Sequence, residues 1–190
     1  MGRHHKKWVT KSILTLLLMV SVPCLAYAAS ITAGSDSAKP DDTIDVSFSY
    51  SAEGASLSSV NFDLNYDASR LSLDSVALGP AGSSASKQIS SNSISAGLEK
   101  VIIYGLNDTV ISDGTLFTAS FTVLSGAADG DAGVSLSDIT GSSPTAQPVA
   151  VTQVSGAVTV DGTVPTVSLT SPGEGDMLDQ TTVTVAGTVD

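Results

Sequence analysis

Cysteine, histidine and tryptophan are almost absent from this sequence. Its 190 residues include one Cys, two His and one Trp, and all four lie within the first 24 residues. The chain beyond residue 28 therefore lacks the side chains for a Ser-His-Asp triad, a cysteine nucleophile, a disulfide or a zinc site with nitrogen and sulfur ligands. It also has no tryptophan platform for sugar rings. We expect no catalytic residues, no metal site and no cofactor.

Half of the few basic residues stand at the N-terminus. Residues 1–28 contain four basic residues and no acid, a largely apolar run from Ser12 to Leu25, and the small-residue motif Ala26-Tyr27-Ala28. This order is typical of a secretory signal peptide, and the apolar run is too short to span a membrane. We predict cleavage near Ala28 and a secreted or cell-surface bacterial protein without a membrane span in its mature chain.

The remaining chain is strongly acidic. After residue 28 it keeps 4 basic and 19 acidic residues, a net charge of −15. So few cations cannot form a footprint on a phosphate backbone, which excludes nucleic acid as a partner. The acids are interpreted mainly as a solvated surface that keeps an exported protein soluble.

Strand patterns recur at short spacing, whereas helix signals are nearly absent. Thr43–Tyr50, Val60–Asp67 and Thr115–Val123 alternate between apolar and polar residues, as strands do when one face is buried and the other is wet. Weaker strands are expected at Ile31–Gly34, Leu71–Leu78, Lys87–Ala96, Val134–Leu136 and Val149–Val160. Many short strands separated by turn residues predict an all-β sandwich over residues 29–160.

The aromatic residues are expected to fill the core of this sandwich, because they fall on the apolar sides of the strands. They are Phe48, Phe62, Tyr66, Tyr104, Phe117 and Phe121. With all of them inside, the surface would lack the exposed rings of a carbohydrate-binding module.

The composition changes after Asp161. Pro165 cannot lie in a central strand, and two further strand patterns follow at Thr166–Thr170 and Thr181–Val189. Residues 165–190 resemble the opening of a bacterial Ig-like repeat. Two strands cannot bury a core by themselves, so we expect residues 161–190 to be a linker and a partial second β unit, which continues further, pairs with a partner or frays.

Carboxylates could in principle support a glycosidase, which needs only two of them. Asp63, Asp67, Glu99 and Asp108 are the candidates, but none lies in a distinctive motif. The acidic segment 129–133 begins like a calcium loop and then lacks the third ligand, the sixth-place glycine and the final Glu of an EF-hand. An ordinary acidic turn is the better interpretation, and the glycosidase ranks last among the alternatives.

The segment from Lys100 to Asp108 is apolar on both faces, unlike the other strands. We place the larger side chains Ile102, Tyr104 and Leu106 inward, so that Val101, Ile103 and Gly105 point outward. An apolar outer face needs a cover, which is a loop of the same domain, a neighbouring domain or a protein partner.

The order of motifs from Ile31 to Val160 resembles a cohesin, the receptor module of cellulosome scaffolds. The five segments that carry the resemblance are residues 38–46, 60–71, 101–105, 112–121 and 156–160. Asp41 stands where the family has Gly in its Lys-Pro-Gly-Asp turn, and Ala68 where it has Pro after Tyr-Asp. The resemblance implies a nine-stranded jelly-roll β-sandwich.

The same resemblance implies that one sheet's outer face binds a dockerin, a small helical module that carries its own calcium. Carried over by position, the partner-binding residues are Ser59, Asn61, Asp63, Ile94, Val101, Ile103, Gly105 and Asp108. We therefore predict a secreted, non-catalytic interaction module. The alternatives are a carbohydrate-binding module, for which polysaccharide would be the partner, and a structural cell-surface spacer.

Overall fold

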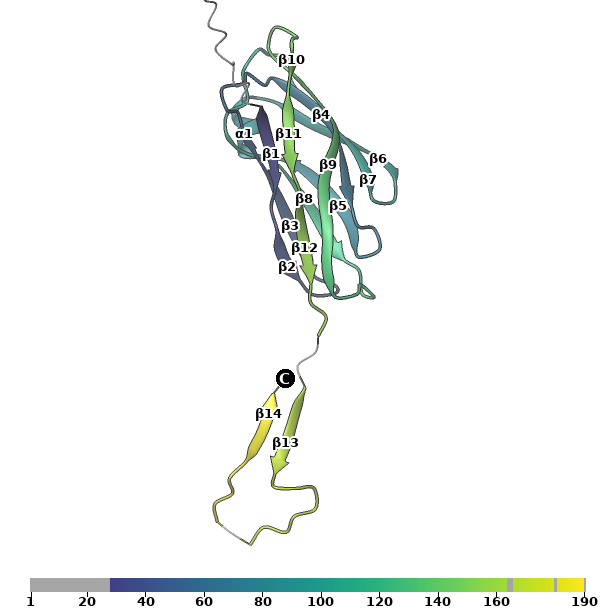
Figure 1. Cartoon of the computed structure of the whole chain (residues 1–190), viewed down its shortest axis with the longest axis vertical. Helices are drawn as coiled ribbons and strands as arrows, with labels where there is room; N and C mark the ends of the chain where they lie inside the picture. Colours follow the sequence, from purple (N-terminus) through teal and green to yellow (C-terminus); the bar gives the residue numbers. More distant parts are fainter. Residues whose placement is uncertain (1–27, 164–165, 180, 190) are drawn as a thin grey trace, which may run out of the picture.

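The computed structural model describes residues 28–163, 166–179 and 181–189. The signal peptide predicted at residues 1–28 therefore lies outside the described residues except for Ala28. From Ala29 to Val160 the chain forms a sandwich of two β-sheets, and a separate hairpin follows (Figure 1). This confirms the all-β jelly-roll sandwich expected from the sequence.

One sheet has five strands and contains the alternating segments at Thr43–Tyr50 and Thr115–Val123. Its order is β11 (Val151–Val154), β1 (Ala29–Ala33), β3 (Thr43–Ser51), β8 (Gly114–Val123) and β5 (Leu71–Leu78). The short helix α1 (Pro80–Ser84), which the sequence patterns did not indicate, follows β5 and packs beside β8.

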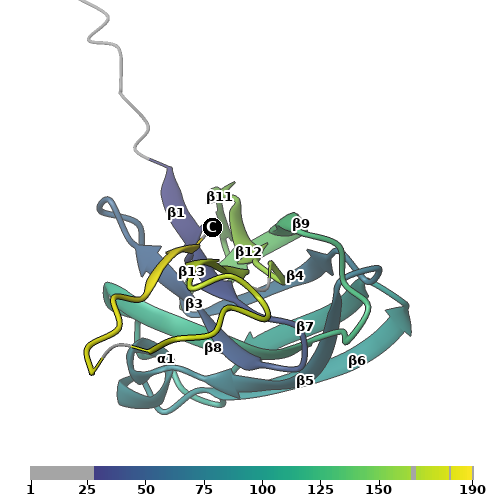
Figure 2. The same ribbon diagram turned by 90° about the horizontal axis from the view of Figure 1, so that it is seen from below.

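The second sheet has seven strands and forms the other layer, as the end view shows (Figure 2). Its order is β2 (Asp36–Ala38), β12 (Gly156–Val160), β9 (Gly130–Ser142), β4 (Ser59–Tyr66), β7 (Leu98–Tyr104) and β6 (Gln88–Ser95), while β10 (Pro148–Val149) pairs with β9. The parallel pairs β1–β11 and β2–β12 join the beginning of the sandwich to its end in both sheets.

The core lies between the two sheets and is built around stacked phenylalanines. The Phe117 ring lies 4.2 Å from that of Phe48 and 5.0 Å from that of Phe62, centroid to centroid. Phe121 is equally buried and contacts Tyr66. The predicted core role of the four phenylalanines is confirmed, and Tyr66 packs partly buried against the same core. The prediction for Tyr104 is wrong, because 37% of this residue is exposed.

The hairpin beyond the sandwich consists of β13 (Val167–Ser171) and β14 (Ala186–Val189). Its apolar residues are largely uncovered: Val167, Leu169 and Met177 are 70%, 66% and 98% exposed. The described residues of this segment thus contain a two-stranded sheet with exposed apolar side chains, and its assignment as a partial second β unit stays a prediction. Its resemblance to an Ig-like repeat stays a prediction.

Candidate functional site

The outer faces of the two sheets differ in the side chains that they expose. On the five-stranded sheet, the outward residues of β3 and β8 are all hydroxyl or acidic: Thr43, Asp45, Ser47, Ser49, Thr118, Ser120 and Thr122. On the seven-stranded sheet, the outward side of β7 carries Ile102, which is 41% exposed, and Tyr104. Exposed apolar residues grouped on one face of a domain mark a candidate contact surface.

The strand β7 has the opposite orientation from the one predicted from the sequence. Val101 and Ile103 are fully buried, whereas Ile102, Tyr104 and Leu106 are exposed. The reason is the pairing with β4, where Val101 lies opposite Phe62 and Ile103 lies opposite Val60. Directly opposed residues share a face of the sheet, so the inward residues of β4 carry Val101 and Ile103 into the core with them.

This orientation corrects two of the predicted contact residues. Val101 and Ile103 cannot touch a partner, because the protein's own chain seals them; they support the sheet from beneath. Because β7 has apolar residues on both sides, the alternation of its sequence does not show which side is buried. Side-chain size indicated the wrong side. The correct side could have been found by aligning β7 with β4, whose inward residues are clear from their alternation with polar residues.

The other predicted residues lie along the seven-stranded sheet and its ends. Asn61 is exposed in the middle of the outer face, and Ser59 is half-buried where β4 begins. Ile94 is 56% exposed at a bulge near the end of β6. Gly105 is half-buried after β7, and Asp108 is exposed in the following loop. Because β7 spans about 20 Å, the structure places Ile94 and Asp108 at opposite ends of this face.

The centre of the face is polar and held by interactions between strands. Asp63 is mostly buried and forms an ion pair with Lys100, which lies opposite it on β7. Asn65 Nδ2 donates a hydrogen bond of 2.9 Å to Ser137 Oγ on β9. The ion pair fixes side chains two residues along the strands from Ile102, and the Asn65–Ser137 bond fixes the face further toward Leu98, so the face is ordered before a partner arrives.

Leu106 extends the exposed apolar residues beyond the end of β7. It is fully exposed, and with Tyr104 and Gln88 it borders a shallow depression of about 290 Å³. Ser86, Gly105 and Asn107 complete the lining of this depression. Together, the exposed residues Ile102, Tyr104 and Leu106 form an apolar strip.

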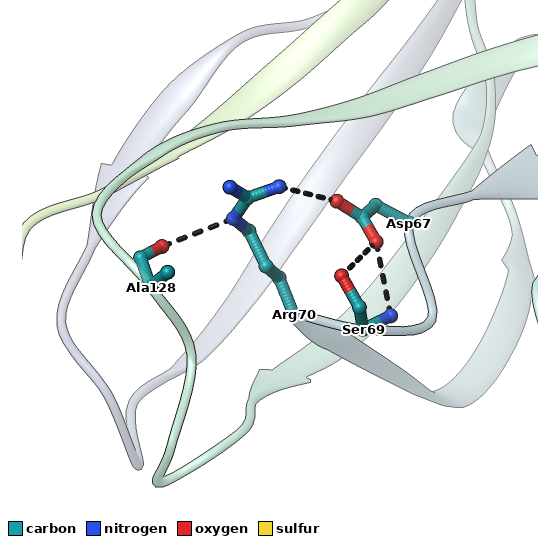
Figure 3. A network of polar contacts seen from close by, with 4 residues as sticks. All are labelled: Asp67, Ser69, Arg70 and Ala128. Atoms are coloured by element: carbon teal, nitrogen blue, oxygen red, sulfur yellow. Dashed lines mark hydrogen bonds and ion pairs between the residues drawn. The ribbon is translucent and has the colours of Figure 1, made fainter.

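The carboxylates considered for a glycosidase lie at different places: Asp63 is opposite Lys100, Glu99 is buried on the other side of the sheet opposite Leu64, and Asp108 is in the loop after β7. Asp67 accepts hydrogen bonds from the backbone N and Oγ of Ser69, at 2.9 and 2.5 Å, and pairs with Arg70 at 2.6 Å (Figure 3). The Ser69 hydrogen bonds, and next the Arg70 contact, lower the pKa of Asp67. Arg70 Nε also donates to Ala128 O, so this cluster closes a turn.

The acidic segment at residues 129–133 also makes structural contacts. Asp129 accepts hydrogen bonds from the Gly162 backbone N at 2.8 Å and from Thr163 Oγ1 at 3.0 Å. Asp131 accepts one from Thr159 Oγ1 on β12. Within residues 28–163, 166–179 and 181–189, no group of three or more His, Cys, Asp or Glu side chains could hold a metal ion.

The residues of the sandwich match a known family model. The model of the cohesin domain matches residues 29–160. The chain belongs to the cohesin family. Cohesins are non-catalytic binding modules that are typically extracellular or displayed on cell surfaces. No curated protein sequence matches the chain. In the part of this cohesin chain that the structure describes, no helix is long and apolar enough to cross a membrane.

Solved cohesin structures share the fold at low sequence identity. The sixth cohesin of scaffoldin B from Acetivibrio cellulolyticus, solved in complex with a Cel5 dockerin mutant, is 24% identical with a TM-score of 0.64, and the match covers 70% of this chain and 99% of that one. The cohesin CaCohA2 from Clostridium acetobutylicum is 19% identical, with a TM-score of 0.62 and coverage of 72% and 93%. A non-cellulosomal cohesin from the archaeon Archaeoglobus fulgidus is 21% identical, with a TM-score of 0.59 and coverage of 71% and 92%.

Proposed function

We propose that this cohesin domain binds a dockerin through the outer face of its seven-stranded sheet and so takes part in assembling an extracellular complex. The observation that carries the proposal is the apolar strip, which lies uncovered beside the polar centre of that face. Structurally similar cohesins support it, since the scaffoldin B cohesin was solved with a dockerin bound.

The two parts of the face would make different contributions to binding. Burial of Ile102, Tyr104 and Leu106 against a helix would supply most of the desolvation free energy, as apolar residues do at the centre of interfaces. Asn61 and the Asp63–Lys100 ion pair would orient the partner, because misplaced polar groups are costly to leave unpaired. Ser59, Ile94, Gly105 and Asp108 would contact its edges.

The charge of the chain favours a partner with basic contact residues. The mature chain predicted from the sequence has a net charge of −15, so a dockerin with lysines or arginines around its apolar contacts would associate faster at low salt. Calcium would be carried by the dockerin.

The proposal also covers the export of the protein and the segments that flank the sandwich. Residues 1–28 would direct export as a signal peptide, and the mature chain would be secreted or held at the cell surface without enzymatic activity of its own. Residues 161–190 would form a linker and the opening of an Ig-like unit, for which the uncovered apolar residues of the hairpin provide support.

Calorimetric titration of the chain with a panel of recombinant dockerins, with and without calcium, tests this function. We expect at least one calcium-loaded dockerin to bind, and Ile102→Asp to weaken that binding at least 100-fold by placing a charge in the apolar strip. The control Ser47→Asp adds the same charge to the outer face of the other sheet and should leave binding unchanged. The proposal fails if no dockerin binds or if both variants bind like the wild type.

Tyr104 supports one alternative, direct binding of polysaccharide. The sequence patterns argued against a sugar site because all rings were expected inside, yet Tyr104 borders the depression together with Gln88. A tyrosine ring beside an amide side chain is a chemistry suited to one sugar unit. Affinity electrophoresis on cellulose and xylan tests this: retardation that is lost in Tyr104→Ala would support it, and unretarded migration of the wild type would exclude it.

A further inference from the structure

Lys87 is a buried cation of the sandwich, and it lies against Gly105 and Asn107, the residues on either side of the exposed Leu106. Only 5% of Lys87 is exposed. Its Nζ donates hydrogen bonds to Ser58 Oγ at 3.1 Å, to Asn107 O at 3.2 Å and to Asn107 Oδ1 at 2.8 Å. Burial lowers the pKa of Lys87, while the nearby Asp108 acts in the opposite direction. The ammonium group thus joins the segment before β4 to the loop after β7.

Asn107 extends this contact through the loop. Its Nδ2 donates to Ser86 O at 3.1 Å, and its Oδ1 accepts from the backbone N of Thr109 at 3.0 Å as well as from Lys87. Both ends of the amide are therefore engaged. The loop 105–109 is held to the beginning of β6 by polar contacts centred on Lys87 and Asn107.

Gly105 allows this arrangement because it lies against the stem of the lysine. A Cβ at this position would be 2.9 Å from Lys87 Cδ, closer than real Cβ atoms approach such a neighbour. The next residue, Leu106, points to solvent and is fully exposed. Since Leu106 has little packing of its own, its position depends on the contacts of Gly105 and Asn107 on either side.

Burial of a lysine between Ser58 and Asn107 carries a desolvation cost in the free energy of folding. Removing an ammonium group from water is unfavourable even when it gains hydrogen bonds, and an apolar side chain of similar length often stabilises a protein as well or better. The acceptors here are a hydroxyl, a carbonyl and an amide oxygen, so no hydrogen-bonded carboxylate offsets the charge. The ammonium group instead contributes three hydrogen bonds of fixed direction, one to Ser58 before β4 and two to Asn107 after β7.

We propose that Lys87 is a positioning residue, which orders the loop 105–109 through Asn107 and thereby presents Leu106 to the partner. This inference rests on the proposed function and adds to it a residue that touches no partner. Ordering the loop before binding removes an entropy cost that would otherwise reduce affinity.

The test is Lys87→Met, which keeps the length of the stem and removes the ammonium group. We expect the Thr109 amide to exchange its hydrogen at least tenfold faster in the free protein, the affinity for a calcium-loaded dockerin that binds the wild type to fall about tenfold, and the midpoint of urea unfolding to remain nearly unchanged. Lys39→Met removes an exposed cation from the β2–β3 turn and should change none of the three quantities.

Two variants of Asn107 make the test specific. Asn107→Ala removes the acceptor of the Thr109 amide itself, so it gives the exchange rate of a released loop with which Lys87→Met is compared. Lys87→Leu takes the place of Lys87→Met if that variant does not fold. Asn107→Asp keeps the oxygen that accepts from Lys87 and Thr109 and should retain most of the affinity. Unchanged exchange at Thr109 in Lys87→Met would overturn the ordering role of Lys87. Faster exchange in Lys87→Met with the full affinity of the wild type would overturn the presenting role.

The exchange measurement separates this inference from the proposed function, because it needs no partner. Absence of any dockerin binding by the wild type would refute the proposed function, and with it the presenting role. Wild-type binding that Ile102→Asp abolishes but Lys87→Met leaves intact would refute the positioning role alone.

Discussion

Ile102 on β7 lies directly opposite Asn61 on β4, so that an exposed isoleucine and an amide share the outer face of the seven-stranded sheet. On its other side, Ile102 is opposite Ser90 of β6. The isoleucine is therefore flanked by polar side chains on both neighbouring strands. A partner that buries Ile102 must also satisfy these polar groups, which favours a specific protein surface over unspecific apolar contact.

The orientation of β7 can be tested by placing the same charge on neighbouring residues. Ile103→Asp should lower the free energy of unfolding by at least about 3 kcal/mol, since it removes a buried side chain and introduces a charge into the core. Ile102→Asp should cost less than about 1 kcal/mol because that residue is exposed. Urea titration followed by circular dichroism measures both values, and the reverse order would show that the opposite face of β7 is buried.

The Asp67–Arg70 cluster should make stability depend on acid pH. The pKa of Asp67 is lowered in the folded state, so the carboxylate contributes stability above its unfolded pKa of about 4, and this contribution is lost as the pH falls through the folded pKa. Because the ion pair is partly exposed, we expect roughly 1 kcal/mol. Asp67→Asn should be less stable than the wild type at pH 6, and the difference should disappear near pH 2 in urea titrations. A constant difference over this range would contradict the assignment.

Gly156 marks a place where two backbones approach each other closely. A Cβ at this position would lie 2.0 Å from Gly34 O, which belongs to the backbone and cannot rotate away. Gly156→Ala should therefore destabilise the sandwich by about 2 kcal/mol or more. Gly126→Ala is the matched control, because its Cβ would meet nothing within 4 Å, and its effect should stay within about 0.5 kcal/mol. Equal thermal unfolding midpoints for the two variants would show that the junction near β12 can relax.

Tyr50 should make stability depend on alkaline pH. Its hydroxyl is buried without a hydrogen-bond partner among the described residues, and burial, followed by the negative charge of Asp113, raises its pKa to about 12. The unfolded chain loses this proton near pH 10, so the free energy of unfolding should fall between pH 10 and pH 12. Tyr50→Phe should match or exceed the wild type at pH 7 and decline less over that range. Parallel curves for the two proteins in urea titrations would contradict this role.

Strand positions could largely be predicted from the sequence where one face is polar. The alternation in β3, β4 and β8 correctly assigned the inward residues, including all four phenylalanines. The reason is that the polar residues of these strands, mainly serine, threonine and acidic residues, lie on the side away from the core. The strand pattern at Val134–Leu136 was too short, since β9 extends over Gly130–Ser142. The elements β2 and α1, with three and five residues, are too short for a periodic signal.

The candidate site was only partly predictable. Its sheet and its polar residues Asn61 and Asp63 followed from the alternation in β4 and from the resemblance to cohesins, and the structure places both on the seven-stranded sheet. The contacts of Lys87 with Ser58 and Asn107 join residues that are 29 and 20 positions apart. No local pattern encodes such contacts.

The amino-acid sequence by itself determined the all-β architecture, the acidic exterior and the phenylalanine core, because each depends on the local alternation or the number of side chains of a given kind. Only the tertiary structure decided which side of β7 faces solvent. That strand is apolar on both sides, so its orientation follows from the hydrogen-bond register with β4, in which Val60 and Phe62 carry Ile103 and Val101 inward and leave Ile102 and Tyr104 outside.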